Sequence, residues 1–185
     1  GPPPDNSEVG EDYRVASLIL IPEKLGGDSI EILTEDIGKL TALTFVNLDG
    51  NRIRELPSSI GKLTNVTTLT ASNNELSSLP EEIGDMESLR NLKLGGNKLS
   101  SIPSSIGQLD SLEDLVLSDN DLTSLPSSVA DLAALDKLHL DNNKLTAEGL
   151  PGRLTELDAL EWLNVANNEI CNPGTEIDAW LDGYH

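Results

Sequence analysis

The sequence repeats itself every 23 residues, and no other feature limits its possible folds as strongly. A dipeptide of an aliphatic and a small residue returns at this interval: Ile37-Gly38, Ile60-Gly61, Ile83-Gly84, Ile106-Gly107 and Val129-Ala130. Asparagines return in step with it: Asn51, Asn74, Asn97, Asn120, Asn143 and, after 25 residues, Asn168. Repeats of about 20 to 50 residues are typical of solenoids, because each unit buries its apolar side by stacking on the next. The sequence therefore predicts one elongated array.

Between these markers, each copy follows the pattern L-x-x-L-x-L-x-x-N-x-L. One copy runs from Leu89 to Leu99, and the next runs from Leu112 to Leu122. Alternate residues of a β-strand face the same side, so the pattern predicts short strands with leucines inside and the intervening residues outside. Stacked copies would form a parallel sheet. A proline after the last leucine, and a glycine after the isoleucine, predict a turn into a short helix on the convex side.

The asparagine of each copy is predicted to lie where the chain leaves the strand. Backbone groups at this point no longer belong to the sheet, and an unpaired polar group in the core would be costly. A buried side-chain amide offers both donors and an acceptor to these groups.

This pattern is similar to the leucine-rich repeat, with six copies, and its closing segment L-P-x-x-I-G-x-L resembles the Ras-suppressor and plant intracellular Ras-group members of that family. The resemblance implies an α/β solenoid, a right-handed horseshoe arc with a concave parallel β-sheet and short convex helices or 3-10 turns. It also implies a non-enzymatic scaffold that binds other proteins through its concave face. The Gly-Val-Tyr-Trp segment of the plant class and the paired-cysteine caps of many secreted members are missing, so subfamily and compartment stay open.

A degenerate copy precedes the six regular ones. Residues 13–36 are predicted to form an N-terminal cap, because terminal repeats need a polar outer face. In this alignment Leu25 takes the place of Leu48, and Asp28 falls in the asparagine column. Glu23 then stands in the predicted strand, where the other copies have an apolar residue.

The remaining boundaries follow from the same pattern. The six repeats fill residues 37–170. Residues 171–185 are predicted to form a C-terminal cap, because their apolar residues recur at helical spacing. Residues 1–12 are rich in proline, acidic and aperiodic, and we expect a disordered leader that is partly a remnant of protein production.

Charge narrows the range of partners. The chain carries 32 acidic and 12 basic residues, a formal net charge of −20. Such a field repels phosphate backbones and anionic lipid surfaces, so nucleic acid is not an expected partner. No apolar run approaches the roughly 20 residues that span a bilayer, so we expect no membrane insertion. The field favours a protein partner with a basic surface, while the oligomeric state stays open.

Catalysis finds little support in the sequence. His139 stands alone on a predicted strand, His185 is the last residue, and the single cysteine, Cys171, is expected to be a buried thiol. The sequence contains no G-x-S-x-G, H-E-x-x-H or phosphate-binding loop, and no EF-hand spacing. We therefore predict that the protein is not an enzyme and uses no cofactor and no metal site.

The candidate partner-binding residues are outward positions in or beside the predicted strands. They are Phe45, Asn47, Thr68, Thr70, Arg90, Asn91, Lys93, Asp114, Val116, Lys137, His139, Asp141, Trp162 and Asn164. Phe45 and Trp162 are candidate hot spots, because aromatic residues are rare in this chain and often anchor interfaces. Alternatively, both rings pack against the caps, with Trp162 near Trp180.

Two functions remain open at this point. The first is an interaction module that binds a protein through its concave face, where Arg90 and Lys93 form a small basic spot beside an acidic stretch. The alternative is an extracellular or cell-surface recognition or adhesion domain of a larger protein, with an acidic patch that takes up calcium. Asp119 and Asp141 lie on neighbouring predicted turns, where they would share one cation or one partner arginine. The single cysteine favours an intracellular location, since secreted members often close their caps with disulfides.

Overall fold

The structure is a computed structural model that describes residues 16–22 and 26–170. One parallel sheet contains seven strands in chain order: β1 (Ser17–Ile19), β2 (Phe45–Asn47), β3 (Thr68–Thr70), β4 (Asn91–Lys93), β5 (Asp114–Val116), β6 (Lys137–His139) and β7 (Trp162–Asn164). A short 3-10 helix precedes each strand from β2 onward: η2 (Glu35–Lys39), η3 (Ser58–Lys62), η4 (Glu81–Asp85), η5 (Ser104–Gln108), η6 (Ser127–Asp131) and η7 (Gly152–Glu156).

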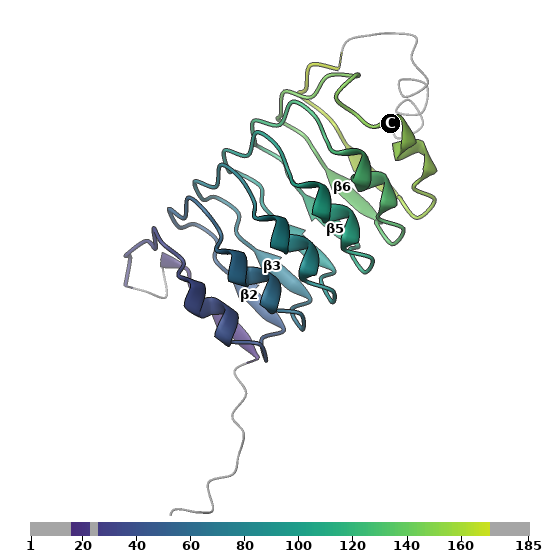
Figure 1. The fold of residues 1–185 in the computed structure, drawn as a ribbon. Coiled ribbons are helices and arrows are strands. Elements are labelled where there is room, and N and C mark those ends of the chain that lie inside the picture. The colour runs from purple at the N-terminus through teal and green to yellow at the C-terminus, as the bar shows by residue number, and fades with distance from the viewer. Residues whose placement is uncertain (1–15, 23–25, 171–185) are drawn as a thin grey trace, which may run out of the picture.

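The strands stack along one side of the molecule and the 3-10 helices along the other, as Figure 1 shows. Strand pairing is in register with the repeat, so that Leu69 pairs with Leu92 and Leu92 pairs with Leu115. Each column of the repeat therefore becomes a row of side chains across the sheet. The predicted solenoid arc, with its parallel sheet and short convex elements, is confirmed.

The convex elements are 3-10 helices of five residues each, and those from η3 to η7 all follow a proline. In η3, Pro57 has the extended backbone of a helix-capping residue, and the Leu63 amide closes the last turn on the Ile60 carbonyl. A segment this short leaves no room for a further α-helical turn. Gly61 and Gly84 let consecutive segments approach closely, because a Cβ at Gly84 would lie 2.4 Å from the Ser105 carbonyl oxygen.

The core is a stack of aliphatic side chains. The middle residue of each strand from β2 to β6 is fully buried, and the central aliphatic residue of each convex segment belongs to the same core cluster. The asparagine column binds the backbone as predicted. Asn97 Nδ2 donates to the carbonyls of Ala71 (2.9 Å) and Leu94 (2.8 Å), and its Oδ1 accepts the Leu76 amide at 3.0 Å. The same bonds recur in neighbouring repeats, so these side chains connect each repeat to the next by hydrogen bonds.

The strand of the degenerate copy lies five residues before its predicted place, so this part of the prediction is wrong. Ser17 pairs with Phe45, which puts Leu20 rather than Leu25 at the position of Leu48. The reason is that Leu18 and Leu20 have the L-x-L alternation of a strand, whereas Pro22 and Glu23 do not.

The asparagine column of that copy is in its predicted place. The Ile30 amide donates to Asn51 Oδ1 at 2.9 Å, as the Ile53 amide donates to Asn74 Oδ1 one repeat later. Asp28, two residues before Ile30, therefore occupies the column. The extra residues between strand and column end at Gly26 and Gly27, whose φ angles of 76° and 97° suit glycine.

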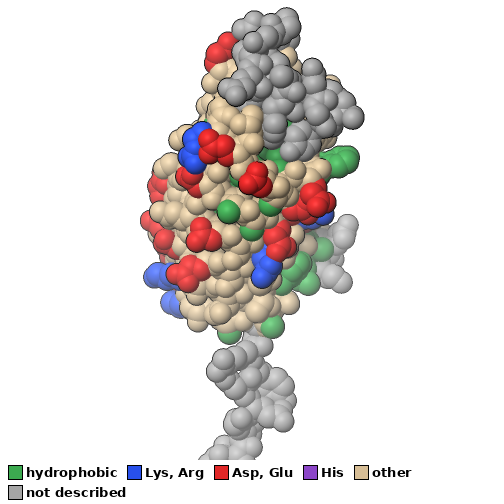
Figure 2. All heavy atoms as spheres, turned by 90° about the vertical axis from the view of Figure 1, so that its right-hand side faces the viewer, with side chains coloured by type: hydrophobic (Ala, Val, Ile, Leu, Met, Phe, Trp, Pro, Cys, Tyr) green, Lys and Arg blue, Asp and Glu red, His purple; other side chains and the backbone are tan. Residues whose placement is uncertain are grey.

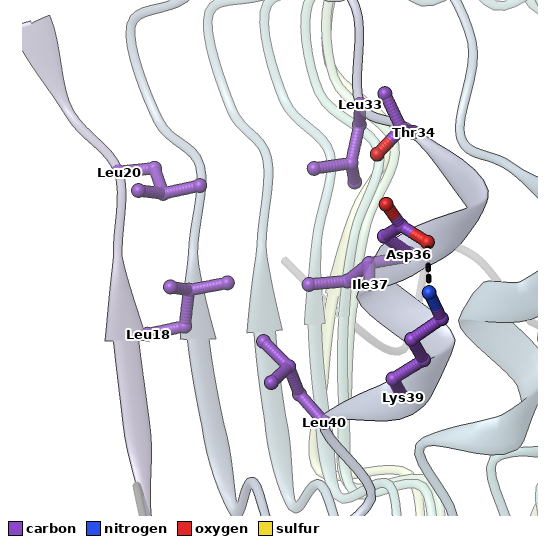
Figure 3. Close-up of a pocket in the computed structure, with 8 residues that line it drawn as sticks. All are labelled: Leu18, Leu20, Leu33, Thr34, Asp36, Ile37, Lys39 and Leu40. Carbon is purple, nitrogen blue, oxygen red and sulfur yellow. Dashed lines mark ion pairs between the residues drawn. The ribbon is translucent and has the colours of Figure 1, made fainter.

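The N-terminal end of the core is partly open. Leu18 of β1 and Leu20 just after it face Ile37 of η2 and Leu40 just after that helix across an apolar groove of about 390 Å³ (Figure 3). The predicted leader at 1–12 and the C-terminal cap at 171–185 lie outside the described residues. No helix in the described ranges is long and apolar enough to cross a membrane.

Candidate binding face

The sheet places the predicted binding residues in parallel rows on its solvent side. The first row, at the strand starts, is Phe45, Thr68, Asn91, Asp114, Lys137 and Trp162. The second row, at the strand ends, is Asn47, Thr70, Lys93, Val116, His139 and Asn164. Arg90 lies just before β4 and Asp141 lies two residues after β6. All fourteen residues thus follow one surface, which we call the concave face.

Strands β2 and β3 have no charged residue in either row of the concave face. Asn91 Nδ2 donates to Thr68 Oγ1 at 3.3 Å, and Asn47 Oδ1 accepts the Asp49 amide at 2.9 Å. Thr70 is only 8% exposed, because neighbouring strands crowd its short side chain, so it offers a partner little area. Phe45 is half-buried at the end of its row.

Strands β4 to β6 and the residues just before them carry the charges, and each basic residue there lies near a carboxylate of the same or the next repeat. Asp114 Oδ2 lies 3.4 Å from Lys93 Nζ, and its Oδ1 lies 3.8 Å from His139 Nε2. Arg90 pairs with Glu113 of the next repeat. The predicted basic spot is therefore largely neutralised by its surroundings. Figure 2 shows one side of the solenoid, on which basic side chains in view lie beside acidic ones.

The ion pairs between repeats were not predicted from the sequence, although the sequence contains a signal for them. Arg90 and Glu113 are 23 residues apart, as are Glu75 and Lys98. Because the strand register equals the repeat period, residues one period apart are neighbours. Opposite charges at that spacing predict an ion pair between repeats.

Trp162 is the main exposed aromatic residue of the concave face. Its side chain is 54% exposed, and its ring centroid lies 6.3 Å from that of His139, with the planes tilted by 37°. The alternative that Trp162 packs near Trp180 involves a residue outside the described part. An indole of this exposure at the end of the sheet is available for contact with a partner.

The carboxylates that follow the strands are held by their own chain. Asp141 Oδ1 accepts the Ser118 hydroxyl at 2.6 Å, and its Oδ2 accepts from Asn142 Nδ2 at 3.1 Å. The Asp119 amide donates to the Asp141 carbonyl at 2.9 Å. Within the described ranges, no group of three or more His, Cys, Asp or Glu side chains is placed to hold a metal ion.

The shifted pKa values belong to exposed groups away from the concave face. Hydrogen bonds from Ser59 lower the pKa of Glu35, and a hydrogen bond from Lys98 lowers that of Glu75. A hydrogen bond to a carboxylate raises the pKa of two basic groups: Lys144 beside Asp121 and Arg153 beside Asp131. Each shift favours the ordinary charged form, so these contacts link neighbouring repeats electrostatically.

Comparison with known proteins agrees with this geometry. The family model for the leucine-rich repeat region matches residues 24–98 and 82–174. No curated protein matches the chain significantly. A leucine-rich repeat protein of Leptospira interrogans superposes with a TM-score of 0.72 at 36% identity, over 76% of this chain and 35% of that one.

Two further solved structures have the same fold. An internalin of Listeria monocytogenes has a TM-score of 0.70 at 24% identity, over 84% of this chain and 42% of its own. The ectodomain of the Arabidopsis thaliana receptor kinase GASSHO1/SCHENGEN3, solved with CASPARIAN STRIP INTEGRITY FACTOR 2, has a TM-score of 0.68 at 25% identity, over 83% of this chain and 21% of its own. This chain thus spans less than half of each neighbour. Because the family model covers most of the sequence, the chain belongs to the leucine-rich repeat proteins.

Proposed function

We propose that the protein binds a protein partner through the concave face of its sheet. Leucine-rich repeat domains are protein-interaction modules, and members of the family are typically non-enzymatic. The observation that carries the proposal is the pair of continuous rows of polar, charged and aromatic side chains on a sheet held in strict register. Such a sheet presents many side chains at fixed spacing, with little cost of ordering on binding.

The charge of the face supports a partner with a basic surface. The basic residues Arg90, Lys93 and Lys137 each lie near a carboxylate already. Among the described residues, neither Asp49 nor Glu161 has a cationic partner. Counted with the flanking carboxylates of Asp49, Glu113, Asp136 and Glu161, the face has more acidic than basic side chains, in a chain with a net charge of −20. A basic partner would be steered toward it at low ionic strength.

The closing segment of the repeat supports a finer placement within the family. Pro57 caps η3 and Ile60 is fully buried, as the L-P-x-x-I-G-x-L pattern requires. We infer from this pattern a kinship with the Ras-suppressor type, whose members act as scaffolds. This placement favours the interaction module over the adhesion alternative.

A pull-down from source lysate tests the concave face. The bait is a variant in which Phe45, Lys93, His139 and Trp162 are replaced by alanine. We expect it to lose the partner that the wild type captures, while its melting temperature changes by only a few degrees, because all four side chains are partly exposed. Capture by the wild type should weaken as salt rises.

A matched variant carries alanine at four exposed positions in or just after the 3-10 helices: Lys62, Glu87, Gln108 and Asp110. We expect this control to keep the partner. If the convex variant loses the partner and the concave variant retains it, binding uses the convex side and the proposal is wrong.

A further inference from the structure

A small recess opens beside the N-terminal end of the concave face, where the chain leaves β2. It has a volume of about 400 Å³ and is lined by Ile21, Pro22, Asn47, Asp49, Gly50 and Asn73. One long side chain fits such a volume with room for its backbone. The recess would give a partner a place to insert an anchor.

Within the described ranges, the carboxylate of Asp49 in this recess has a hydrogen-bond partner for only one of its two oxygens. Asp49 Oδ1 accepts the Ser72 amide at 2.7 Å, whereas Oδ2 has neither a hydrogen-bond donor nor a cation among the described residues. Asp141 occupies the same column of the repeat, and there the chain engages both oxygens, through Ser118 and Asn142. Asp49 is therefore fixed in place with one oxygen available.

The rest of the recess combines an apolar wall with amides. Ile21 and Pro22 are half-buried, and Pro22 Cδ lies 3.8 Å from the position that a Cβ on Gly50 would take. Asn47 Oδ1 accepts a hydrogen bond from the Asp49 amide, and this bond orients the aspartate backbone. Asn73 has a φ of 56° and adds a second side-chain amide to the lining.

We propose that this recess receives an arginine side chain of the protein partner, an inference that rests on the proposed function. The aliphatic stem would pack on Ile21 and Pro22, and the guanidinium would donate to Asp49 Oδ2. Arginine fits better than lysine, because its guanidinium is flat, less strongly hydrated than an ammonium group and presents several N–H donors to a carboxylate. An anionic ligand is excluded by the carboxylate in the recess and by the net charge of −20.

The test uses N-acetyl-arginine amide as the probe, followed by two-dimensional NMR of the backbone amides. Asp49→Asn removes the charge and keeps an oxygen for the Ser72 amide, and Asp141→Asn is the matched control in the same column. We expect saturable shifts at Gly50 and Ser72 in the wild type and in Asp141→Asn. We expect at least tenfold weaker binding to Asp49→Asn, and no saturable shift with the uncharged citrulline analogue.

The proposal is overturned if the wild type gives no saturable shift, or if Asp49→Asn binds the arginine probe as well as the wild type does. This titration needs no partner, so it decides the recess independently of the pull-down. If the concave alanine variant loses the partner but the arginine probe does not bind, the recess proposal fails and concave-face binding stands. If the probe binds and the concave variant keeps its partner, the recess binds arginine and the proposal that fails is binding through the concave face.

Discussion

At the scale of single residues, the buried asparagine of each repeat makes a large contribution to the free energy of unfolding. Asn97 is 8% exposed and bonds to Leu76, Ala71 and Leu94. Asn97→Ala would leave the buried Leu76 amide unpaired, at about 1–3 kcal/mol. It would also remove one of the two bonds to each of the Ala71 and Leu94 carbonyls, which still accept from Asn74 and Asn120. We expect urea unfolding to give a loss of about 2–4 kcal/mol. Asn65→Ala removes a single exposed bond and should cost less than about 0.5 kcal/mol. Equal losses would contradict a special role for the column.

For single residues, the sequence predicts which side chains face outward but not how much of each side chain is exposed to solvent. The period-two alternation placed Trp162 and Lys93 on the solvent side of the sheet. It gave no measure of the crowding that leaves Thr70 only 8% exposed, because that depends on the neighbouring strands. The recess at Asp49 also escaped prediction, since one wall comes from Ile21 and Pro22 in a segment that departs from the repeat.

At the scale of elements, the spacing of the 3-10 helices depends on the glycine that follows each isoleucine. A Cβ on Gly84 would lie 2.4 Å from the Ser105 carbonyl oxygen, a backbone atom of η5. Gly84→Ala must therefore push η4 and η5 apart, and we expect it to cost about 1–3 kcal/mol. Gly152→Ala in η7 meets nothing within 4 Å, so denaturant unfolding should find it neutral or slightly stabilised. A neutral Gly84→Ala would mean that the convex side is loosely packed.

The repeating elements were predictable because every copy has the same pattern of residues. Leucine alternation, asparagine, proline and glycine recur in step, and each constraint agrees with the others. The prediction failed where this agreement ends. Before Asp28 the chain inserts extra residues between strand and column, so alignment by the column misplaced β1 by five residues. The L-x-L spacing of Leu18 and Leu20 was the better guide, because strand pairing depends on which side chains the core can bury.

At the scale of the whole molecule, the solenoid should open from its ends. Contacts run only between neighbouring repeats, so a terminal repeat is held on one side. The amides of Leu20, Leu94 and Leu140 form a matched set, because each donates to the next repeat at 2.7–2.8 Å. Leu94 lies in the middle of the stack and is fully buried, whereas Leu20 lines the apolar groove at the N-terminal end (Figure 3).

Native-state hydrogen exchange would measure this gradient. We expect Leu94 to exchange most slowly, Leu140 faster, and Leu20 at least tenfold faster than Leu94, a difference of about 1.4 kcal/mol in opening free energy. Because the hydrogen bonds are alike, a gradient reports the position of the repeat and not local geometry. Equal protection at all three amides would show that the array unfolds as one cooperative unit. The rows of the concave face would then be rigid from one end of the sheet to the other.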